Sequence, residues 1–401
     1  MKFRSHIYKY LVKYLVPEFI KRRRREKWIR VYPIIKNAQD LFPVLCKLTD
    51  DSWDDMLYPP LYGHSKEQCL QVYVPALYAY EINNAVINCN SDVVITDYGV
   101  YWDKYNEEEF TTWAKPADSN VLWYNRENIG IRLEKNTQKI SGKVLSLMGT
   151  YCSNWSHFLS QYICKLYLAG ENNLLNENVT ILYYNKSEDS CIDQFIIDYL
   201  KRYPLVSIKK AEQSIDYVCE KLISIPATAA NFNDYHFRLD YPYLVPNFVL
   251  ERVEKYIIQP YTERIKARPT KHEKIFLIRK GNFRNLINYN EIHDFFQTMG
   301  FYDIDGSALT IEQKADIFYH AKEIVGVFGG ANQNLMFCNG ARCMLFTNYH
   351  FVTQSWSYTY AHKKVACWIN VTGIDETADY HSGFTVPLEK VKKVYEENIK
   401  N

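Results

Sequence analysis

The second half of the chain alternates short apolar runs with segments that repeat apolar residues at helical spacing. Each apolar run has the length of a buried strand, and each helical segment is bounded by residues that favour helix ends. Strands joined to helices in this way form parallel sheets, which bind ligands at the carboxyl ends of their strands. The predicted strands are residues 274–278, 301–304, 323–328 and 343–347, with helices in the gaps between them.

Capping residues mark the starts and ends of these helices. Thr310 and Gln313 fit a capping box, in which each side chain bonds to the backbone of the other residue. Asn288 and Glu291 have the same spacing before the first helix, which is expected to end at Gly300.

The middle of the chain shows the same kind of pattern. Residues 143–148 are apolar, and a helical pattern then runs from Asn154 to Gly170 with His157 in its first turn. This part is therefore also predicted to be α/β. Its further strands are expected at 179–184, 205–208 and 222–225, with a helix at 191–200.

Residues 31–80 carry a weaker pattern. Pro33, Pro43 and the Pro59-Pro60 pair predict helical or irregular structure there. The acidic pairs on either side of Trp53 are interpreted as a solvated loop. Short strands are expected beyond this segment at 85–87, 93–96, 99–102 and 121–124.

Four regions follow from these patterns. A basic segment at 1–30 precedes an N-terminal α/β domain at 31–240, and a linker at 241–246 leads to a C-terminal α/β domain at 247–385. A closing helix at 386–401 is expected to return to the N-terminal domain. A chain of 401 residues is long for a single core, which supports two domains.

Residues 1–30 combine apolar residues at helical spacing with many lysines and arginines, including the run at 21–25. The apolar stretch is too short for a membrane span and lacks the features of a signal peptide. Basic amphipathic helices bind anionic membrane surfaces, so this segment is predicted to do so. The alternative is a terminal helix docked on the protein, with a solvated run of charge.

Composition narrows the function classes. Hydrophobic residues make up 47% of the chain and charged residues 23%, which are globular values, and a net charge of +2 provides no field for nucleic acid. The ten cysteines lack the paired spacing of a zinc site, so no metal is expected. Free thiols suit a reducing compartment, which predicts a cytoplasmic protein, peripheral at the plasma membrane if 1–30 binds there.

Two predicted strand ends carry candidate chemistry. Arg279, Lys280 and Arg284 crowd positive charge onto one loop. After the third strand, Gly329-Gly330 allows a ligand to approach the backbone closely, and the next helix offers its free N–H groups. Together these loops would hold a diphosphate. The alternative is an ordinary strand-to-helix turn with surface arginines, because a lone Gly-Gly pair is a weak signal.

The order of these motifs resembles glycosyltransferase family 61. The resemblance covers residues 143–350. It implies an α/β fold of the GT-B type, in which two Rossmann-type doubly wound domains face a cleft, and an inverting transfer from a nucleotide sugar without a bound metal. The motifs that carry it are Leu-Ile-Arg279 with Arg284 and Asn288, Leu-Thr-Ile-Glu-Gln313, and Gly329-Gly330 before Asn334-Leu-Met-Phe337.

The resemblance also implies substrates and roles for residues. The donor is expected to be a UDP-linked sugar, with no further cofactor, and the acceptor a glycan or lipid-linked glycan of a bacterial capsule or other surface polysaccharide. One departure is clear, because the family commonly has His-Gly-Ala where this chain has Phe328-Gly329-Gly330. The donor-binding residues would be Arg279, Lys280, Arg284, Asn288, Gln313, Gly329, Gly330, Ala331 and Asn334.

His157 is the candidate catalytic base. In the first turn of a helix, the dipole opposes a positive imidazole and favours the neutral form that a base requires. The segment from Asn154 to Leu159 also resembles a family segment, Asn-x-x-His-Trp-Leu, with phenylalanine in place of tryptophan. The alternative is a histidine that only orients a loop. The acceptor side is predicted to include Asn154, His236 and Arg238.

Other functions fit parts of the pattern. A polysaccharide pyruvyltransferase has a similar two-domain form and basic pocket, and a non-catalytic glycan-binding or assembly protein would tolerate the change at Phe328. A nicotinamide oxidoreductase fits least, since no Gly-x-Gly-x-x-Gly follows a strand. Asp303-Ile-Asp305 is interpreted as a loop rather than a metal site.

Overall fold

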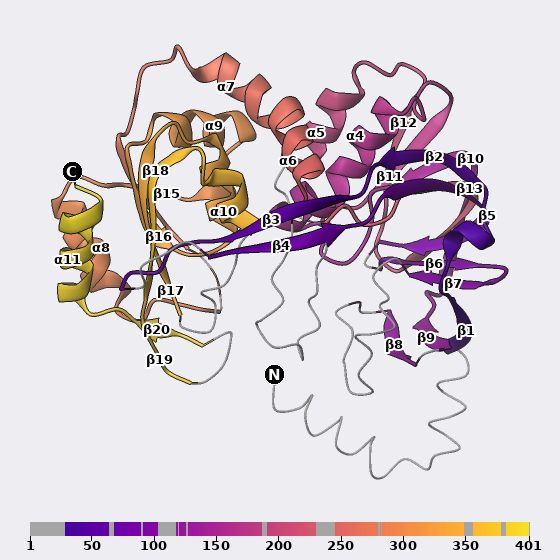
Figure 1. The fold of residues 1–401 in the computed structure, drawn as a ribbon, viewed down its shortest axis with the longest axis horizontal. Coiled ribbons are helices and arrows are strands. Elements are labelled where there is room, and N and C mark those ends of the chain that lie inside the picture. The colour runs from indigo at the N-terminus through magenta and orange to yellow at the C-terminus, as the bar shows by residue number, and fades with distance from the viewer. Residues whose placement is uncertain are drawn as a thin grey trace, which may run out of the picture.

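The described residues form two large sheets, which lie at opposite ends of the molecule (Figure 1), and two small two-stranded ones. Helices and strands occur in both parts, so the predicted α/β class is confirmed. The N-terminal segment predicted to bind membranes lies almost wholly outside the described residues. The computed structural model describes residues 29–63, 68–89, 91–102, 118, 120–125, 127–186, 191–229, 245–279, 281, 283–348, 356–377 and 382–400.

The second sheet has the order β15-β14-β16-β17-β18, and all its neighbouring strands are parallel. The four strands predicted from the apolar runs are confirmed, and β18 was not foreseen. The strands are β14 (Lys274–Leu277), β15 (Tyr302–Ile304), β16 (Glu323–Val327), β17 (Ala341–Thr347) and β18 (Val365–Thr372).

Helices cover both faces of this sheet. One face packs on α8 and α11, where Phe276, Phe296 and Tyr395 share a cluster, and the other packs on α9 and η5. The closing helix α11 packs against α8 and β18, and it contacts the first part through Glu397, which accepts from the hydroxyl of Tyr62 (3.0 Å). The helices are α8 (Tyr289–Thr298), the 3₁₀ turn η4 (Gly306–Ala308), α9 (Ile311–His320), the 3₁₀ helix η5 (Gly330–Phe337), α10 (Trp356–Ala361) and α11 (Leu388–Asn398).

The two predicted capping boxes have different outcomes. The box between Thr310 and Gln313 is present at the start of α9. At α8 the box is absent, because the Asn288 side chain bonds to the carboxylate of Glu291 (2.9 Å) and to the backbone of Val386, and not to the first turn of the helix. The residue spacing was correct, but the polar side chains bond to each other.

The first sheet is mixed, and in the described residues it has 11 strands. Its strands β12-β11-β10-β13 are mutually parallel, and β1 and β7 form a second parallel pair, so the sheet is mixed rather than wholly parallel as a doubly wound sheet would be. Short turns, such as the one between β6 and β7, can join only antiparallel strands. The strands are β1 (Ile29–Ile35), β2 (Val44–Thr49), β5 (Leu77–Asn88), β6 (Val93–Thr96), β7 (Gly99–Trp102), β8 (Val121–Tyr124), β9 (Asn128–Arg132), β10 (Asn136–Ser146), β11 (Val179–Tyr183), β12 (Ser207–Lys210) and β13 (Ile215–Ser224).

The helical or irregular prediction for residues 31–80 is wrong, because this segment contains most of β1 and much of β5, with other strands between them. Pro33 does not interrupt β1, since the strand changes partners there. Its earlier residues pair with β9, while Ile34 and Ile35 pair with β7. A proline at such a change of partner removes little regular ladder bonding.

Two long helical segments link the two parts of the molecule through their packing contacts. The first is continuous through α3 (Trp155–His157), a π-helical turn η2 (Phe158–Tyr162) and α4 (Ile163–Glu171). The second runs through α6 (Asn247–Val253), η3 (Glu254–Ile258) and α7 (Gln259–Ile265), with α6 against α4 and α7 against α9. One cluster of buried apolar residues, which includes residues of both sheets and of α5 (Cys191–Leu200), makes the core continuous.

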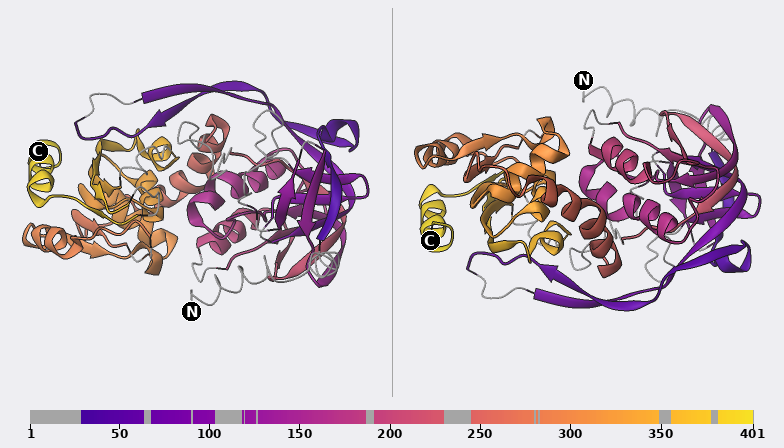
Figure 2. Two further views of the ribbon diagram at one scale, coloured as in Figure 1. Left: turned by 90° about the horizontal axis from the view of Figure 1, so that it is seen from below. Right: turned by 90° about the horizontal axis from the view of Figure 1, so that it is seen from above.

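A two-stranded arm runs along one side of the molecule from the first sheet toward the second (Figures 1 and 2). It consists of β3 (Ser52–Tyr58) and β4 (Gln68–Val74), and residues 59–62 continue it. Its end adds to the edge strand β18, where Tyr62 N–H donates to the carbonyl of Asn370 (2.9 Å). A small hairpin of β19 (Ile374–Asp375) and β20 (Phe384–Thr385) follows β18.

The arm also corrects the prediction of a solvated acidic loop. Asp54 is 2% exposed and accepts from the backbone N–H of Asn247 (2.7 Å) at the start of α6. A carboxylate is favourable there because it faces the positive end of the helix dipole. Asp54 therefore fixes the arm to the connecting helix.

Two further observations concern the described residues only. No helix among them is long and apolar enough to cross a membrane. The ten cysteines form no disulfide in this part of the chain.

Candidate active site

Two loops meet where the second sheet changes direction. β14 and β16 are neighbours, but the connection after β14 leads to β15 on one side and the connection after β16 leads to β17 on the other. Because the two connections diverge, a crevice forms at the carboxyl ends of these strands, and this is where ligands bind in such sheets. Arg279 follows β14, and Gly329 follows β16.

Arg279 lies directly against the second loop. Its guanidinium donates through Nη1 to the carbonyl of Phe328 (3.0 Å) and through Nη2 to the carbonyl of Phe283 (3.2 Å). A Cβ at Gly329 would collide with Nη1, so only glycine allows this approach. Burial and the neighbouring Arg284 lower the pKa of Arg279 to about 10. The group stays protonated at neutral pH, and a bound anion would offset the cost of burying it.

Arg284 supplies the second positive charge of this loop. Its backbone has a φ of +54°, in the left-handed region, and its side chain is half-buried. Its charge contributes to the lowered pKa of Arg279. Lys280, predicted to act with them, lies outside the described residues.

A run of buried amides follows Gly329. Asn332, Gln333 and Asn334 are at most 2% exposed. Asn332 Oδ1 accepts from the N–H of Gly329 (2.6 Å), and Asn334 Nδ2 donates to the carbonyl of Ala331 (2.9 Å). Among the described residues, the other amide atom of each asparagine, and Nε2 of Gln333, has no partner.

Unpartnered amide atoms of this kind are costly. Each buried donor or acceptor without a partner costs about 1–3 kcal/mol. Three in succession beside two guanidinium groups indicate that a polar ligand or ordered water completes this part of the structure. The sequence pattern singled out Asn334 and missed Asn332 and Gln333.

Helix α3 brings His157 to the same place. Its N-cap Asn154 accepts from the N–H of Ser156 (3.1 Å), so the predicted helix start is confirmed, with His157 in the first turn. The imidazole is half-buried, and its ring centroid lies 5.0 Å from that of Tyr151. Because α3 contacts η5, the turn that carries His157 lies against the helix of buried amides. The two predicted parts of the site therefore meet.

Gln161 is a further polar residue of this helix, and the sequence analysis missed it. It is fully buried in η2, and neither atom of its amide has a partner among the described residues. It lies four residues after His157, which places it on the same side of the helix. π-helical turns occur frequently at functional sites, and they carry no local sequence signal.

Residues 155–345 match the family model described as Glycosyltransferase 61. This region belongs to the glycosyltransferase 61 family. It extends from α3 to β17 and so includes both His157 and η5. No curated protein matches the chain.

The departure from the glycosyltransferase 61 pattern at Phe328 has a structural consequence. The phenylalanine ring is 2% exposed and lies 6.5 Å from the ring of Trp368, centroid to centroid. The residue therefore fills the core with its side chain and supports Arg279 with its carbonyl. It supplies no imidazole where the family commonly has one.

Other predicted donor-binding residues of the family region hold its helices in place. Asn288 exchanges hydrogen bonds with the backbone of Val386 (2.8 and 3.2 Å), and Gln313 Oε1 accepts from the N–H of Thr310 (2.9 Å). Gly330 and Ala331 form the first turn of η5, with open space beside Gly330. A donor role for Asn288 and Gln313 stays a prediction, as does the role of His236 and Arg238, which lie outside the described residues.

The acidic residues Asp303 and Asp305 have structural partners. Asp303 accepts from His293 Nε2 (2.9 Å) and from Gln297 Nε2 (2.8 Å). Asp305 accepts from the N–H of Ser307 (3.0 Å) at the start of η4. Within the described residues, no three His, Cys, Asp or Glu side chains form a group that could hold a metal ion.

Proposed function

We propose that the protein is an inverting glycosyltransferase that moves a sugar from a nucleotide-sugar donor, expected to be UDP-linked, to a glycan hydroxyl. One observation carries the proposal: the guanidinium of Arg279 lies against Gly329 at the direction change of a parallel sheet, where a helix of buried amides begins. The family to which residues 155–345 belong is named for glycosyltransferases, which supports the proposal.

In the proposed complex, the diphosphate lies between Arg279, Arg284 and the first turn of η5. The N–H groups of Gly330 and Ala331 begin that helix and are available to an anion. Cleavage of the sugar–phosphate bond builds negative charge on the leaving diphosphate, and donors that are already in place stabilise it. The unpartnered amide atoms of residues 332–334 would bind hydroxyl groups of the donor.

His157 is the proposed base on the acceptor side. It would take the proton of the acceptor hydroxyl while the oxygen attacks the anomeric carbon opposite the diphosphate, which inverts that carbon. Gln161, on the same side of the helix, would bind the acceptor with its free amide. Asn154, His236 and Arg238 remain proposed residues of the acceptor side.

The proposal extends to the arrangement and location of the protein. Residues 31–240 and 247–385 would act as the two domains of a GT-B enzyme, and the diphosphate contacts would need no metal. Residues 1–30 would hold the enzyme on the anionic inner face of the plasma membrane. A lipid-linked glycan acceptor is located there, as required for capsule or another surface polysaccharide.

The buried ring of Phe328 favours a second candidate function. If the family requires an imidazole at this position for catalysis, this chain would bind the nucleotide sugar or the glycan without transferring the sugar. The two candidates share the donor site and differ in turnover.

The test is a thermal-melting screen of the full chain with nucleoside diphosphates and their sugar derivatives. A nucleotide at about 100 times its Kd adds about 2.7 kcal/mol of stability. UDP or a UDP-sugar should raise the melting temperature of the wild type and of Arg132→Ala, an exposed control. At the same nucleotide concentration it should raise that of Arg279→Ala by half as much or less, because a 10- to 100-fold higher Kd leaves only about 0.4–1.4 kcal/mol of stabilisation.

Turnover then separates the candidates. Release of UDP with a glycan acceptor supports the transferase and excludes a pyruvyltransferase, whereas binding without release supports the binding protein. If no nucleotide shifts the melting temperature, the donor assignment is wrong.

A further inference from the structure

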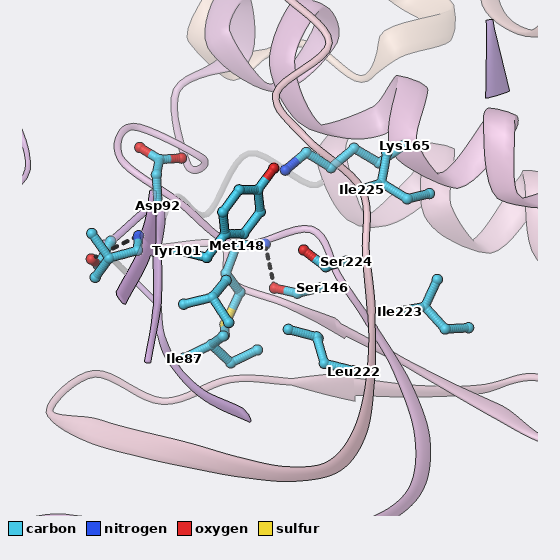
Figure 3. A pocket seen from close by; sticks show the side chains of 13 residues that line it. Ile87, Asp92, Tyr101, Ser146, Met148, Lys165, Leu222, Ile223, Ser224 and Ile225 are labelled. Carbon is cyan, nitrogen blue, oxygen red and sulfur yellow. Dashed lines mark hydrogen bonds between the residues drawn. The ribbon is translucent and has the colours of Figure 1, made fainter. Parts of the chain in front are cut away.

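A small cavity opens at the carboxyl ends of β10 and β13 in the first sheet (Figure 3). Ser146 ends β10, Ser224 ends β13, Tyr101 comes from β7, and Lys165 comes from α4. Apolar side chains of the sheet form much of the remaining wall. The strand ends of the first sheet therefore carry a polar cavity of their own, separate from the crevice beside Arg279.

Hydrogen-bond donors converge at one end of this cavity. Lys165 is 7% exposed, and its Nζ lies 5.6 Å from the ring centroid of Tyr162. Figure 3 shows its ammonium group pointing toward the hydroxyl of Tyr101, with the hydroxyls of Ser146 and Ser224 below it. Ser146 Oγ accepts from the N–H of Met148 (3.2 Å), which leaves its own proton to donate.

The acidic residue of the wall is held by other groups. Asp92 Oδ1 accepts from the hydroxyl of Tyr162 (3.0 Å), and Oδ2 accepts from the N–H of Thr150 (3.1 Å). In Figure 3 its carboxylate lies on the far side of the Tyr101 hydroxyl from Lys165. The end of the cavity at Lys165 is therefore lined by an ammonium group and hydroxyls, which suits an anion.

The size of the cavity restricts that anion. A volume of about 30 Å³ takes about two water-sized groups, since each needs roughly 10–15 Å³. A carboxylate fits this space and a whole sugar ring does not. The sugar ring would therefore lie outside the cavity.

We propose that this cavity binds the carboxylate of a uronic-acid-type sugar in the acceptor glycan. The inference rests on the proposed function only in taking the glycan to be the acceptor. Lys165 follows His157 by eight residues in one continuous helical segment, a rise of about 12 Å. The sugar bound here is therefore a neighbour of the reacting sugar, and the cavity selects acceptors by a charge at a distance from the chemistry.

The test compares methyl β-glucuronide with methyl β-glucoside, which differ only in the carboxylate, by ligand-observed NMR titration of the full chain. The glucuronide should bind at least tenfold more tightly, because a charge-assisted bond to an ammonium is strong. Lys165→Met should remove this preference, and Ser224→Ala should weaken glucuronide binding roughly threefold. Lys139→Met, an exposed lysine on the same sheet, should change nothing.

Each other outcome has a defined meaning. Equal binding of the two glycosides, or glucuronide binding that survives both Lys165→Met and Ser224→Ala, overturns the inference. Acetate that competes as well as the glucuronide shows a simple anion site and also overturns it. The UDP melting shift is measured on the same variants. If it is absent while the glucuronide preference is present, the proposed function fails and the cavity assignment stands.

Discussion

The two sides of the candidate site are built differently. On the side of the second sheet, the groups that would meet a ligand are guanidinium groups and backbone N–H groups fixed by the ends of β14 and β16. On the side of the first sheet, they are His157 and Gln161 on one helical segment that contains a π turn. In the proposed enzyme, the guanidinium and backbone groups would recognise the charge that sugar nucleotides share. Side chains on a helix can be exchanged without altering the sheet, so the first-sheet side would set the chemistry and the acceptor.

His157→Ala should show the largest effect and would confirm the division of roles. If His157 is the base, kcat should fall by about 10²–10⁴ while the affinity for the donor stays nearly constant. Steady-state kinetics, donor titration and thermal melting on this variant provide the measurement, with His272→Ala as a control on the other part of the chain. A destabilised variant with near-normal kcat would remove His157 from the mechanism.

Arg279→Ala should have the opposite signature. Loss of a charge-assisted bond to phosphate should cost about 1.5–3 kcal/mol of donor binding, which is roughly a 10- to 100-fold rise in Kd. Arg279→Lys should recover only part of it, because an ammonium lacks the planar fork that meets two carbonyls. Calorimetry measures both variants. Unchanged donor affinity in Arg279→Ala would show that Arg279 does not bind the donor, and the proposed difference between the two sides of the site would be wrong.

Gln161→Met tests whether the buried amide of Gln161, on the side of the first sheet, lowers the stability of the protein while contributing to acceptor binding. Methionine is similar in size and has no amide, so the variant no longer buries an unpartnered polar group. Its free energy of unfolding should therefore be about 1–3 kcal/mol higher than that of the wild type. Its KM for the acceptor should rise at the same time. Chemical denaturation and kinetics are compared with Gln138→Met, an exposed residue of β10. A less stable variant would mean that Gln161 has partners in the folded protein.

Chelation should have the smallest effect. The leaving diphosphate would be neutralised by guanidinium and backbone groups, so EDTA should leave the transfer rate unchanged. Loss of activity that manganese restores would assign the diphosphate contacts to a metal. It would also mean that guanidinium and backbone N–H groups are not sufficient to neutralise the diphosphate on the side of the second sheet.

The same contrast explains what the sequence could predict. The second sheet could be predicted from local patterns. Each of its predicted strands is a short apolar run, each helix repeats apolar residues at helical spacing, and short connections between them favour a parallel order. β1 shows the opposite case, since it lies between β7 and β9, which come much later in the chain. No local pattern specifies such a partner. Pro33 even argued against the strand, although it lies at the point where β1 changes neighbours.

The candidate site divides in a similar way. Arg279, Gly329 and His157 were predictable because positive charge, glycine pairs and helix starts are visible in a linear pattern. The burial of Asn332, Gln333 and Gln161 was not, since it depends on which helices meet between the two sheets. Asn288 has the residue spacing of a capping box with Glu291, but its side chain bonds to the carboxylate of Glu291 and to the backbone of Val386. Residue spacing alone therefore does not determine which hydrogen bonds a polar side chain forms.

The arm has a consequence for the order of events during synthesis. Its strands end at Val74. The residues that it docks against come much later in the chain: Asn370 of β18, and Glu397 of α11, which accepts from the hydroxyl of Tyr62 (3.0 Å). Residues as far as Glu397 must therefore leave the ribosome before the arm can dock completely. Until then the arm has an unpaired end that can pair with another chain. Nascent molecules stalled late in translation should for this reason be the most prone to associate.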